Sequence, residues 1–446
     1  MQETVASALA QLARLDAKAA RSAESALASL TAGQGLESLS QRAVQEFCWY
    51  VLPVRFTRET GDRLNVATSL GRLFSLLDMP RYADICTSAA TRDILACYDS
   101  AHDAGLTAYE RQMRASGIEP PDLSELTWGT PLGTAETDAY HATSAALELS
   151  IAVGDIRPGT RGWRAAQEQH ARSFLTQPDP QGRSRLDRIR EERVRDWLAS
   201  PSHPHRQRFW PLLGQIITGA ETPPGAADAL APVQRLLQYA DDGIGLTQIG
   251  YISPNVVREL RAEFDWDTVP APPRSETDVM QLIALHKLLR TMRAVRRSGR
   301  RLVLTRRGRQ LYASTDALWR AVGENVLNTD GFEQAAIETL LGLLLMRSPR
   351  STGSHARAEA VETDIAEEAR LVLADAGWEH PSGGDEPPTQ QVRSVLLTVT
   401  WLLETLGCVV GGDLLSEGRS QRLTKVGRAF ALTAIHLSAT TPRASI

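Results

Sequence analysis

The sequence is short of cysteine, aromatic residues and lysine, and each shortage narrows the class of protein. Its 446 residues include 4 cysteines, and aromatic residues make up 6%. No Cys-x-x-Cys pair occurs, so neither a zinc ribbon nor a disulfide framework is indicated, and we expect buried thiols in a reducing compartment. Only three lysines stand against 46 arginines, a bias typical of a GC-rich genome, so arginine content alone does not indicate nucleic-acid binding.

Long apolar runs and catalytic fingerprints are also missing. The longest apolar stretch, residues 394–410, is interrupted by Glu404 and is too short to span a membrane. Residues 1–18 have no basic segment before an apolar one, so no signal peptide is expected. Nucleotide-binding, zinc-protease and serine-hydrolase patterns do not occur, and His203 and His205 have no further ligands nearby in sequence. We therefore expect a cytoplasmic protein without a membrane partner, cofactor or metal.

What remains is a helix-rich globular composition. Hydrophobic residues make up 42% and charged residues 23%, and apolar residues recur at helical spacing through the first half. A chain of this length is expected to hold more than one domain. A Pro/Gly-rich stretch at 217–232 and a weaker break at 328–334 predict a helical domain over 1–235, followed by modules at 236–327 and 328–446.

Two segments of the second half resemble each other, residues 289–315 and residues 403–433. Both contain Leu-Thr-x-x-Gly-Arg, at 304–309 and 423–428, and the extra residues of the second copy fall in a turn. Each segment predicts a helix, a two-stranded hairpin and a second helix. Thr caps and Gly turns are common, so convergence of two amphipathic segments is the alternative to a true repeat.

The first copy contains several local signals for this arrangement. Residues 275–278 read as a capping box before an apolar helix, and Pro254 suits the first turn of an earlier helix. Ser298-Gly299 predicts a tight turn, and Leu302 and Leu304 alternate as on a strand with one buried face. Thr305 is then placed to cap the following helix.

Helix, helix, hairpin and helix with a Leu-Thr-x-x-Gly-x-x-Leu junction resembles the winged-helix domains of bacterial transcription regulators of the multiple-antibiotic-resistance and phenolic-acid types. The resemblance implies a mainly α fold in which a helical N-terminal domain precedes two winged-helix-like modules with short β-hairpins. Residues 244–322 also look like the C-terminal helical portion of plasmid pRi open-reading-frame-three-like proteins. The α+β domain usual in that family is not evident here, so no role is carried over from it.

Charge separates the two copies. Residues 279–315 contain ten basic side chains and no acidic one, although the whole chain has a net charge of −4. These ten are Lys287, Arg290, Arg293, Arg296, Arg297, Arg300, Arg301, Arg306, Arg307 and Arg309. In a winged helix they would fall at the end of the recognition helix, on the wing and in the next turn, where phosphates are contacted. Residues 391–437 have five basic and three acidic residues, which indicates a structural or dimerising sibling.

Three classes of function are consistent with these features. The first is non-catalytic binding of duplex DNA by the ten basic residues, because no aromatic residue lies between the arginines to stack on single strands. The second is an interaction scaffold whose basic face binds an acidic protein, a second copy, or the chain's own acidic segment 357–370. That segment carries Glu359, Glu362, Asp364, Glu367 and Glu368. The third is an enzyme, for which the carboxylate candidates are Asp84, Asp93, Asp103 and Glu110; their spacing is that of solvated helices, so no catalytic residue is assigned.

Overall fold

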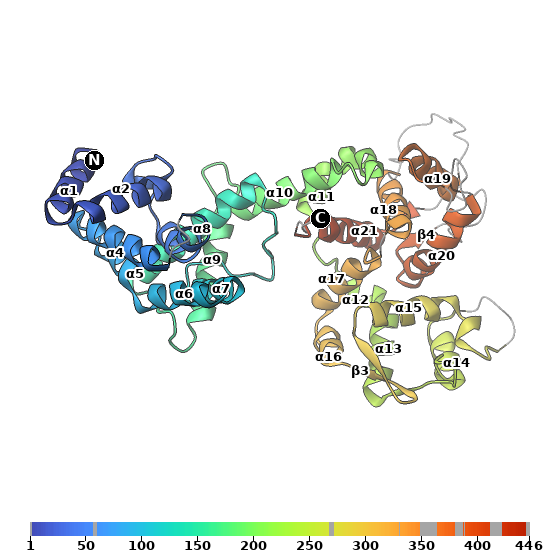
Figure 1. Ribbon diagram of the computed structural model, residues 1–446. Helices are drawn as coiled ribbons and strands as arrows, with labels where there is room; N and C mark the ends of the chain where they lie inside the picture. Colours follow the sequence, from blue (N-terminus) through green and yellow to red (C-terminus); the bar gives the residue numbers. More distant parts are fainter. Residues whose placement is uncertain are drawn as a thin grey trace. The chain divides into compact units, whose positions relative to one another are not determined.

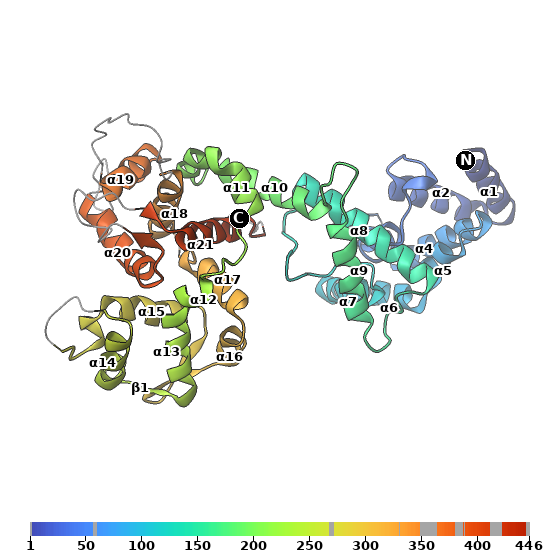
Figure 2. The same cartoon turned by 180° about the vertical axis from the view of Figure 1, so that it is seen from behind.

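The computed structural model describes residues 2–56, 60–266, 272–329, 331–347, 364–379, 387, 389–410 and 422–442. Over these ranges the fold is mainly α with short antiparallel hairpins, as the sequence predicts. The chain forms two compact units, residues 1–189 and residues 190–442 (Figures 1 and 2). None of the helices in the described ranges is both long enough and apolar enough to cross a membrane.

The first unit is a bundle of helices around its own hydrophobic core. Its core is built largely by Leu70, Leu73 and Phe74 of α4 together with residues of the first helices and of α5–α7. Asp16, Ser40 and Ser88 each accept a backbone N–H at the start of a helix, as N-cap residues do. The elements are α1 (Gln2–Leu15), α2 (Ala17–Thr31), η1 (Leu36–Ser38), α3 (Gln41–Glu46), η2 (Phe47–Phe56), α4 (Thr60–Leu76), α5 (Pro80–Thr87), α6 (Ala89–Ser100), α7 (His102–Ser116), α8 (Thr134–Val153), α9 (Trp163–Thr176) and the start of α10 (Arg185–Leu198).

Among the described residues, the second unit holds the remaining helices and the five strands. Its elements are η3 (Pro204–Leu212), α11 (Leu213–Thr218), α12 (Ala226–Ala229), α13 (Ala231–Asp242), β1 (Ile244–Gly245), α14 (Pro254–Glu263), η4 (Glu276–Asp278), α15 (Met280–Thr291), β2 (Val295–Ser298), β3 (Arg301–Leu304), α16 (Arg306–Tyr312), α17 (Thr315–Val326), α18 (Gly331–Met346), α19 (Ile365–Asp375), α20 (Thr389–Thr405), β4 (Val409–Val410), β5 (Arg422–Leu423) and α21 (Lys425–Ala439). One continuous core runs from Val194 to Ala439.

The border between the units lies between Ile189 and Arg190, within α10, and not at residue 235. The Pro/Gly-rich stretch at 217–232 reads as a linker in sequence, but Ile216 just before it and Leu230 near its end are fully buried in the core of the second unit. Ile216 also accepts a hydrogen bond from Nδ1 of His436 in α21 at 2.7 Å. A loop between two buried anchors does not separate domains, because both of its ends pack into the same core.

A buried ion-pair network joins η3 to α18 in this second unit. Nε and Nη2 of Arg206 each donate to a carboxylate oxygen of Glu338 at 2.8 Å, and Nε2 of His205 lies 2.9 Å from the same carboxylate. Glu338 is fully buried. Burial by itself raises the pKa of this carboxyl, but the hydrogen bonds from His205 and Arg206 outweigh it and hold the pKa below its ordinary value. His203 and His205, the two histidines of this segment, thus differ in their surroundings.

The first basic module begins with α13, β1 and α14, which Figure 2 shows in succession. It continues with η4, α15 and the hairpin β2–β3, and the three strands form one antiparallel sheet in the order β1-β3-β2. Val295 pairs with Leu304, and Ser298 with Arg301, so a two-residue turn at Gly299 closes the hairpin, as expected. Leu302 and Leu304 are buried, whereas Arg301 is exposed, in agreement with the predicted alternation.

The predicted caps are present, with one difference. Residues 275–278 do form a capping box, but it closes the short 3₁₀ turn η4, and α15 starts at Met280 after it. The Thr305 side chain accepts the backbone N–H of Gly308 at 2.9 Å, as an N-cap should. The helix that follows Thr305 is divided, because Ser314 caps a new helix, α17.

The two copies share their backbone hydrogen bonds at the junction. In the first copy the Thr305 N–H and hydroxyl donate to the Ala294 carbonyl, at 2.9 and 3.0 Å. In the second copy the Thr424 N–H donates to the Cys408 carbonyl at 2.9 Å, and the Thr424 side chain accepts the Gly427 N–H at 2.9 Å. Glycine is required at both junctions. A Cβ at position 308 would lie 2.1 Å from the Ala294 carbonyl oxygen, and a Cβ at position 427 would lie 1.8 Å from the Cys408 carbonyl oxygen. These matched bonds support a true repeat.

Helices at equivalent positions of the two copies pack against each other. α15 of the first copy contacts α20 of the second, and α17 contacts α21. Nε1 of the fully buried Trp319 donates to Oγ1 of Thr433 at 3.2 Å, and the ring meets Phe430 edge-on at 5.5 Å between centroids. The two modules are therefore one folding unit with one core.

Candidate nucleic-acid interface

All ten predicted basic residues lie at the surface of the first module. They are distributed over five consecutive elements: Lys287 and Arg290 on α15, Arg293 in the turn after it, Arg296 and Arg297 on β2, Arg300 and Arg301 at the tip of the hairpin, and Arg306, Arg307 and Arg309 on α16. Only short connections separate these elements along the chain.

Few of these charges are neutralised. Three have acidic neighbours: Lys287–Glu333 at 3.2 Å, Arg307–Glu324 at 4.0 Å and Arg309–Asp241 at 3.4 Å. All three pairs are well exposed, and such pairs contribute about 0–1 kcal/mol and exchange readily with solvent ions. The other seven arginines make no ion pair with any residue that the structure describes. A surface of this kind attracts polyanions.

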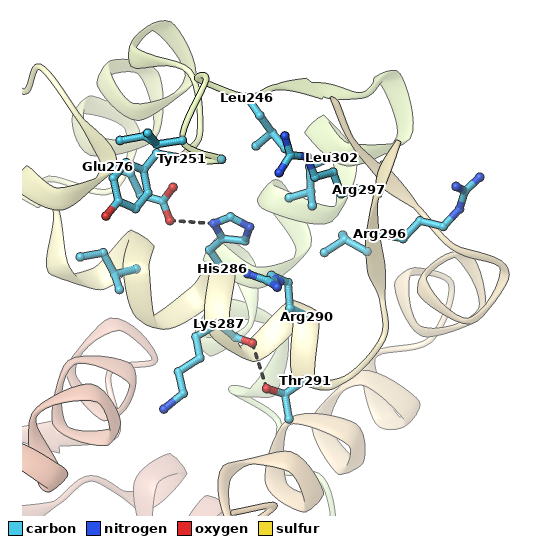
Figure 3. A pocket seen from close by; sticks show the side chains of 14 residues that line it. Leu246, Tyr251, Glu276, His286, Lys287, Arg290, Thr291, Arg296, Arg297 and Leu302 are labelled. Carbon is cyan, nitrogen blue, oxygen red and sulfur yellow. Dashed lines mark hydrogen bonds and ion pairs between the residues drawn. The ribbon is translucent and has the colours of Figure 1, made fainter. Parts of the chain in front are cut away.

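A cleft of about 670 Å³ opens beside these arginines, between α15, β2 and the loop 246–251 (Figure 3). Its floor is apolar and includes Leu246, Ile283, Val295 and Leu302. Its rim carries Arg290, Arg296 and Arg297. The cleft thus combines apolar and strongly cationic walls, an arrangement that phosphate attraction alone does not require.

A buried carboxylate fixes the inner wall of the cleft. Oε1 of Glu276 lies 2.7 Å from Nδ1 of His286, and Oε2 accepts the backbone N–H of Ile252 at 2.6 Å. Glu276 is almost wholly buried, and His286 is buried in the cleft wall on α15. Since the carboxylate accepts the Nδ1–H, the Nε2 nitrogen is left for a ligand. Glu276 therefore holds together the loop, η4 and α15.

The loop 246–251 brings two apolar side chains to the mouth of the cleft. Ile249 is 77% exposed and Tyr251 is 36% exposed, and both line the cleft. The loop is closed by hydrogen bonds from Thr247 N–H to the Tyr251 carbonyl at 2.8 Å and from Tyr251 N–H to the Thr247 hydroxyl at 3.0 Å. Gly250, at φ +93°, lets the chain turn beside the Arg297 guanidinium.

The predicted basic residues do not all face this cleft. Lys287, Arg290, Arg296 and Arg297 contribute to its lining, but the Arg296 side chain extends outward from the hairpin and the Lys287 ammonium pairs with Glu333 of α18 (Figure 3). α15 is also not free along its length, because one side of it packs on α20. The winged-helix interpretation predicts that this helix enters a DNA groove. In the structure, the side of the helix next to the cleft is the side that remains accessible.

Four residues of the cleft were missed by the sequence analysis: Ile249, Tyr251, Glu276 and His286. Glu276 stands inside the predicted capping box, where an acidic residue has an ordinary explanation. His286 is one of nine scattered histidines. No aromatic residue lies between Arg290 and Arg309 in the sequence, but folding brings Tyr251 to the same cleft as Arg290 and Arg297 from outside that range.

Basic residues of the second module are held by internal partners. Nη1 of Arg428 donates to the Leu345 carbonyl at 3.1 Å, and Nη2 bonds to the Gln215 side chain. Arg393 forms an ion pair with Asp364. The hairpin of this module, residues 411–421, lies outside the described residues. Two basic side chains of the second module are therefore used in contacts within the second unit.

The acidic segment 357–370 has local partners where it is described. Asp364 pairs with Arg393, Glu367 with Arg370 at 2.8 Å and Glu368 with Arg347 at 2.6 Å; Glu359 and Glu362 lie outside the described residues. The side-chain hydrogen bond from Arg370 is the main cause that lowers the pKa of the Glu367 carboxyl. These three acids bind arginines of their own module rather than the ten basic residues.

The carboxylates considered for an enzyme are separate from the cleft. Asp84, Asp93, Asp103 and Glu110 are all exposed, on α5, α6 and α7. Glu110 pairs with Arg114 one turn later, at 3.0 Å. Within the described ranges, no three His, Cys, Asp or Glu residues form a group that could hold a metal ion.

Comparison with known proteins gives one match. A family model described as the Y4jL N-terminal domain matches residues 227–317, which run from α12 into α17. No curated protein and no solved structure matches the chain. The matched stretch contains all ten basic residues and the whole cleft, so the first module, from α13 to the start of α17, is similar to a domain that occurs elsewhere.

Proposed function

We propose that the chain is a non-catalytic, duplex DNA-binding protein, with an accessory or regulatory role, that binds through the basic surface of its first module. The observation that carries the proposal is the exposure of seven arginines without an acidic partner among the described residues. Duplex DNA presents one negative charge per about 1.7 Å of axis, and its phosphates release counterions when such side chains neutralise them.

The order of elements supports the same proposal. A helix, a short strand, two helices and a hairpin, in a sheet of order β1-β3-β2, is the arrangement expected of a winged helix. In this interpretation the hairpin tip at Arg300 and Arg301 lies against the DNA backbone, and Arg306 at the start of α16 contacts the next phosphate. The open side of α15 would face the groove. The free state of all four cysteines fits a cytoplasmic location.

The test is fluorescence anisotropy of a labelled blunt duplex titrated with the whole chain over a series of salt concentrations. We expect micromolar binding that weakens steeply with salt. In a variant with Arg296, Arg297, Arg300 and Arg301 changed to Ala, the slope of log K against log salt should fall by about 0.9 for each phosphate contact that is lost. Retained affinity and an unchanged slope would refute the proposal.

A matched variant has the same four arginines changed to Lys. It keeps the charges and so should keep most of the salt slope, because lysine binds phosphate as a point charge. Thermal melting of both variants shows whether they fold. Competition with heparin separates the alternative function: if heparin displaces the protein as readily as unlabelled duplex does, the basic face recognises an acidic partner without preference for DNA.

A further inference from the structure

We infer that the cleft between α15, β2 and the loop 246–251 takes a single unpaired nucleotide, so that the protein prefers duplex DNA that carries one. The inference rests on the proposed function and deepens it, because it names the kind of DNA. The chemistry recognised is that of a flat base joined to a phosphate.

Size and lining are the first reason. A cleft of about 670 Å³ is within the range of sites for small molecules, about 300–1,000 Å³. A whole duplex is too large to enter such a space, because even its major groove is about 12 Å wide. The apolar floor formed by Leu246, Ile283, Val295 and Leu302 has no use against phosphates, but it suits the face of a base.

The second reason is the exposed aromatic ring at the mouth. Base stacking on aromatic side chains is the common way to hold an unpaired nucleotide, and it tolerates any sequence because every base has a π face. Tyr251 is held in place by two hydrogen bonds between its backbone and Thr247, and Ile249 stands beside it. Tyr251 lines the cleft with about a third of its surface exposed.

The third reason is the placement of charge and hydrogen-bonding groups. Arg290 and Arg297 line the cleft from α15 and from β2, where they can bind the phosphates on either side of one nucleotide. Nε2 of His286 provides a polar contact in the wall for the edge of a base. Glu276 fixes that imidazole and the loop together, so binding costs little ordering of the site.

Two sources could supply this chemistry, a nucleotide within a DNA strand or a free mononucleotide. The arginines beyond the cleft favour the strand, because Arg300, Arg301 and Arg306 lie on elements where flanking phosphates would bind. The experiment therefore includes both. It uses the whole chain and three probes that carry the fluorescent base 2-aminopurine: a duplex with one bulged 2-aminopurine nucleotide, a blunt duplex with the same base paired, and 2-aminopurine riboside monophosphate.

We expect the bulged duplex to bind at least tenfold more tightly than the blunt duplex, with a change in 2-aminopurine emission on binding. Tyr251→Ala should remove this tenfold preference and leave affinity for the blunt duplex unchanged. Tyr251→Phe should keep the preference, because the ring and not the hydroxyl is used. Tyr251 lies at the surface, so we expect both variants to keep the fold, and thermal melting checks this.

Each other outcome decides between the two proposals. Equal affinity for bulged and blunt duplex, unaffected by Tyr251→Ala, overturns the nucleotide cleft and leaves the proposed DNA binding intact. Binding of the monophosphate alone, lost in Tyr251→Ala, overturns DNA binding and identifies a free nucleotide as the occupant. If none of the three probes binds, both proposals are wrong.

Discussion

The two copies of the repeat have the same backbone at their junctions and different charges on their surfaces. Thr305 and Thr424 cap their helices in the same way, and Gly308 and Gly427 each leave room for a carbonyl oxygen. Yet residues 279–315 have ten basic residues and no acid, whereas the second copy has a mixture that is partly used in internal bonds. Hydrogen bonds and close contacts fix the fold of both copies, while their exposed side chains are free to differ.

The two modules also differ in the way they use a buried glutamate. In the first module Glu276 holds His286 at the wall of an open cleft. In the second module Glu338 binds both His205 and Arg206 in a sealed interior. Both glutamates contact an imidazole. In the second module Arg206 closes the site where the first module has an open cleft, so the contact there is a structural element. Four predictions test this comparison, from the largest expected effect to the smallest.

Removal of the sealed carboxylate should have the largest effect. Glu338→Ala leaves Arg206 and His205 buried without their acid, and losing one partner of a buried pair costs about 3–5 kcal/mol. The folded pKa of Glu338 lies below its ordinary value of 4.5, so its contribution is complete above about pH 4.5 and is lost as the pH falls through the lower folded value. Urea unfolding of wild type and variant should therefore differ most at neutral pH, and the difference should shrink toward pH 3. A constant difference would contradict the assignment.

The two junction glycines come next. Gly308→Ala and Gly427→Ala each place a Cβ within about 2 Å of a backbone carbonyl oxygen, and we expect each to lower the free energy of unfolding by about 3 kcal/mol. Gly214→Ala in α11 is the control, because nothing lies near its Cβ; it should raise stability by up to about 1 kcal/mol. If both junction variants have the melting temperature of the wild type, the close contacts assigned to the shared junction are wrong.

A smaller effect on stability is expected when arginine and glycine are exchanged at the position just before each hairpin. Arg293 has a left-handed φ of +55°, and Gly407 has φ +60° at the equivalent position. A side chain in this conformation costs about 1–2 kcal/mol, so Gly407→Arg should destabilise by about 1 kcal/mol. Arg293→Gly should be neutral or stabilise by up to about 1 kcal/mol, since glycine gives back part of the gain as chain entropy. Thermal melting of both single variants measures the two signs.

The smallest effect should be on DNA affinity when charges of the second copy are removed. Arg422→Ala with Lys425→Ala neutralises two exposed positions next to the junction. We expect less than a twofold change in affinity for the blunt duplex in the anisotropy assay, against a large loss when Arg300 and Arg301 are changed in the first copy. Equal losses from the two pairs would assign the binding to both modules.

Local sequence signals predicted the local structure well. The Thr305 cap, the turn at Gly299 and the burial of Leu302 and Leu304 were all confirmed, because each depends on contacts within a few residues. The mainly α fold class follows from the same periodicities.

Contacts between distant segments could not be predicted in this way. Glu276 binds the backbone at Ile252 and the ring of His286, and nothing in the spacing of these residues indicates such a contact. The same holds for Tyr251 beside the arginines. The border of the units was misplaced for a related reason: a Pro/Gly-rich stretch reports a loop, but only the burial of its two flanks shows whether the loop joins domains.

The packing of α15 on α20 and of α17 on α21 has a consequence for stoichiometry. Contact between equivalent elements is also found in a two-fold homodimer, where the same patch of each subunit meets its copy; here both partners belong to one chain. A symmetric regulator presents two identical charged faces and reads a palindrome. Here only one half carries the charge, so under the proposed function each chain would offer a single binding face, and its DNA site would need no repeated half-site.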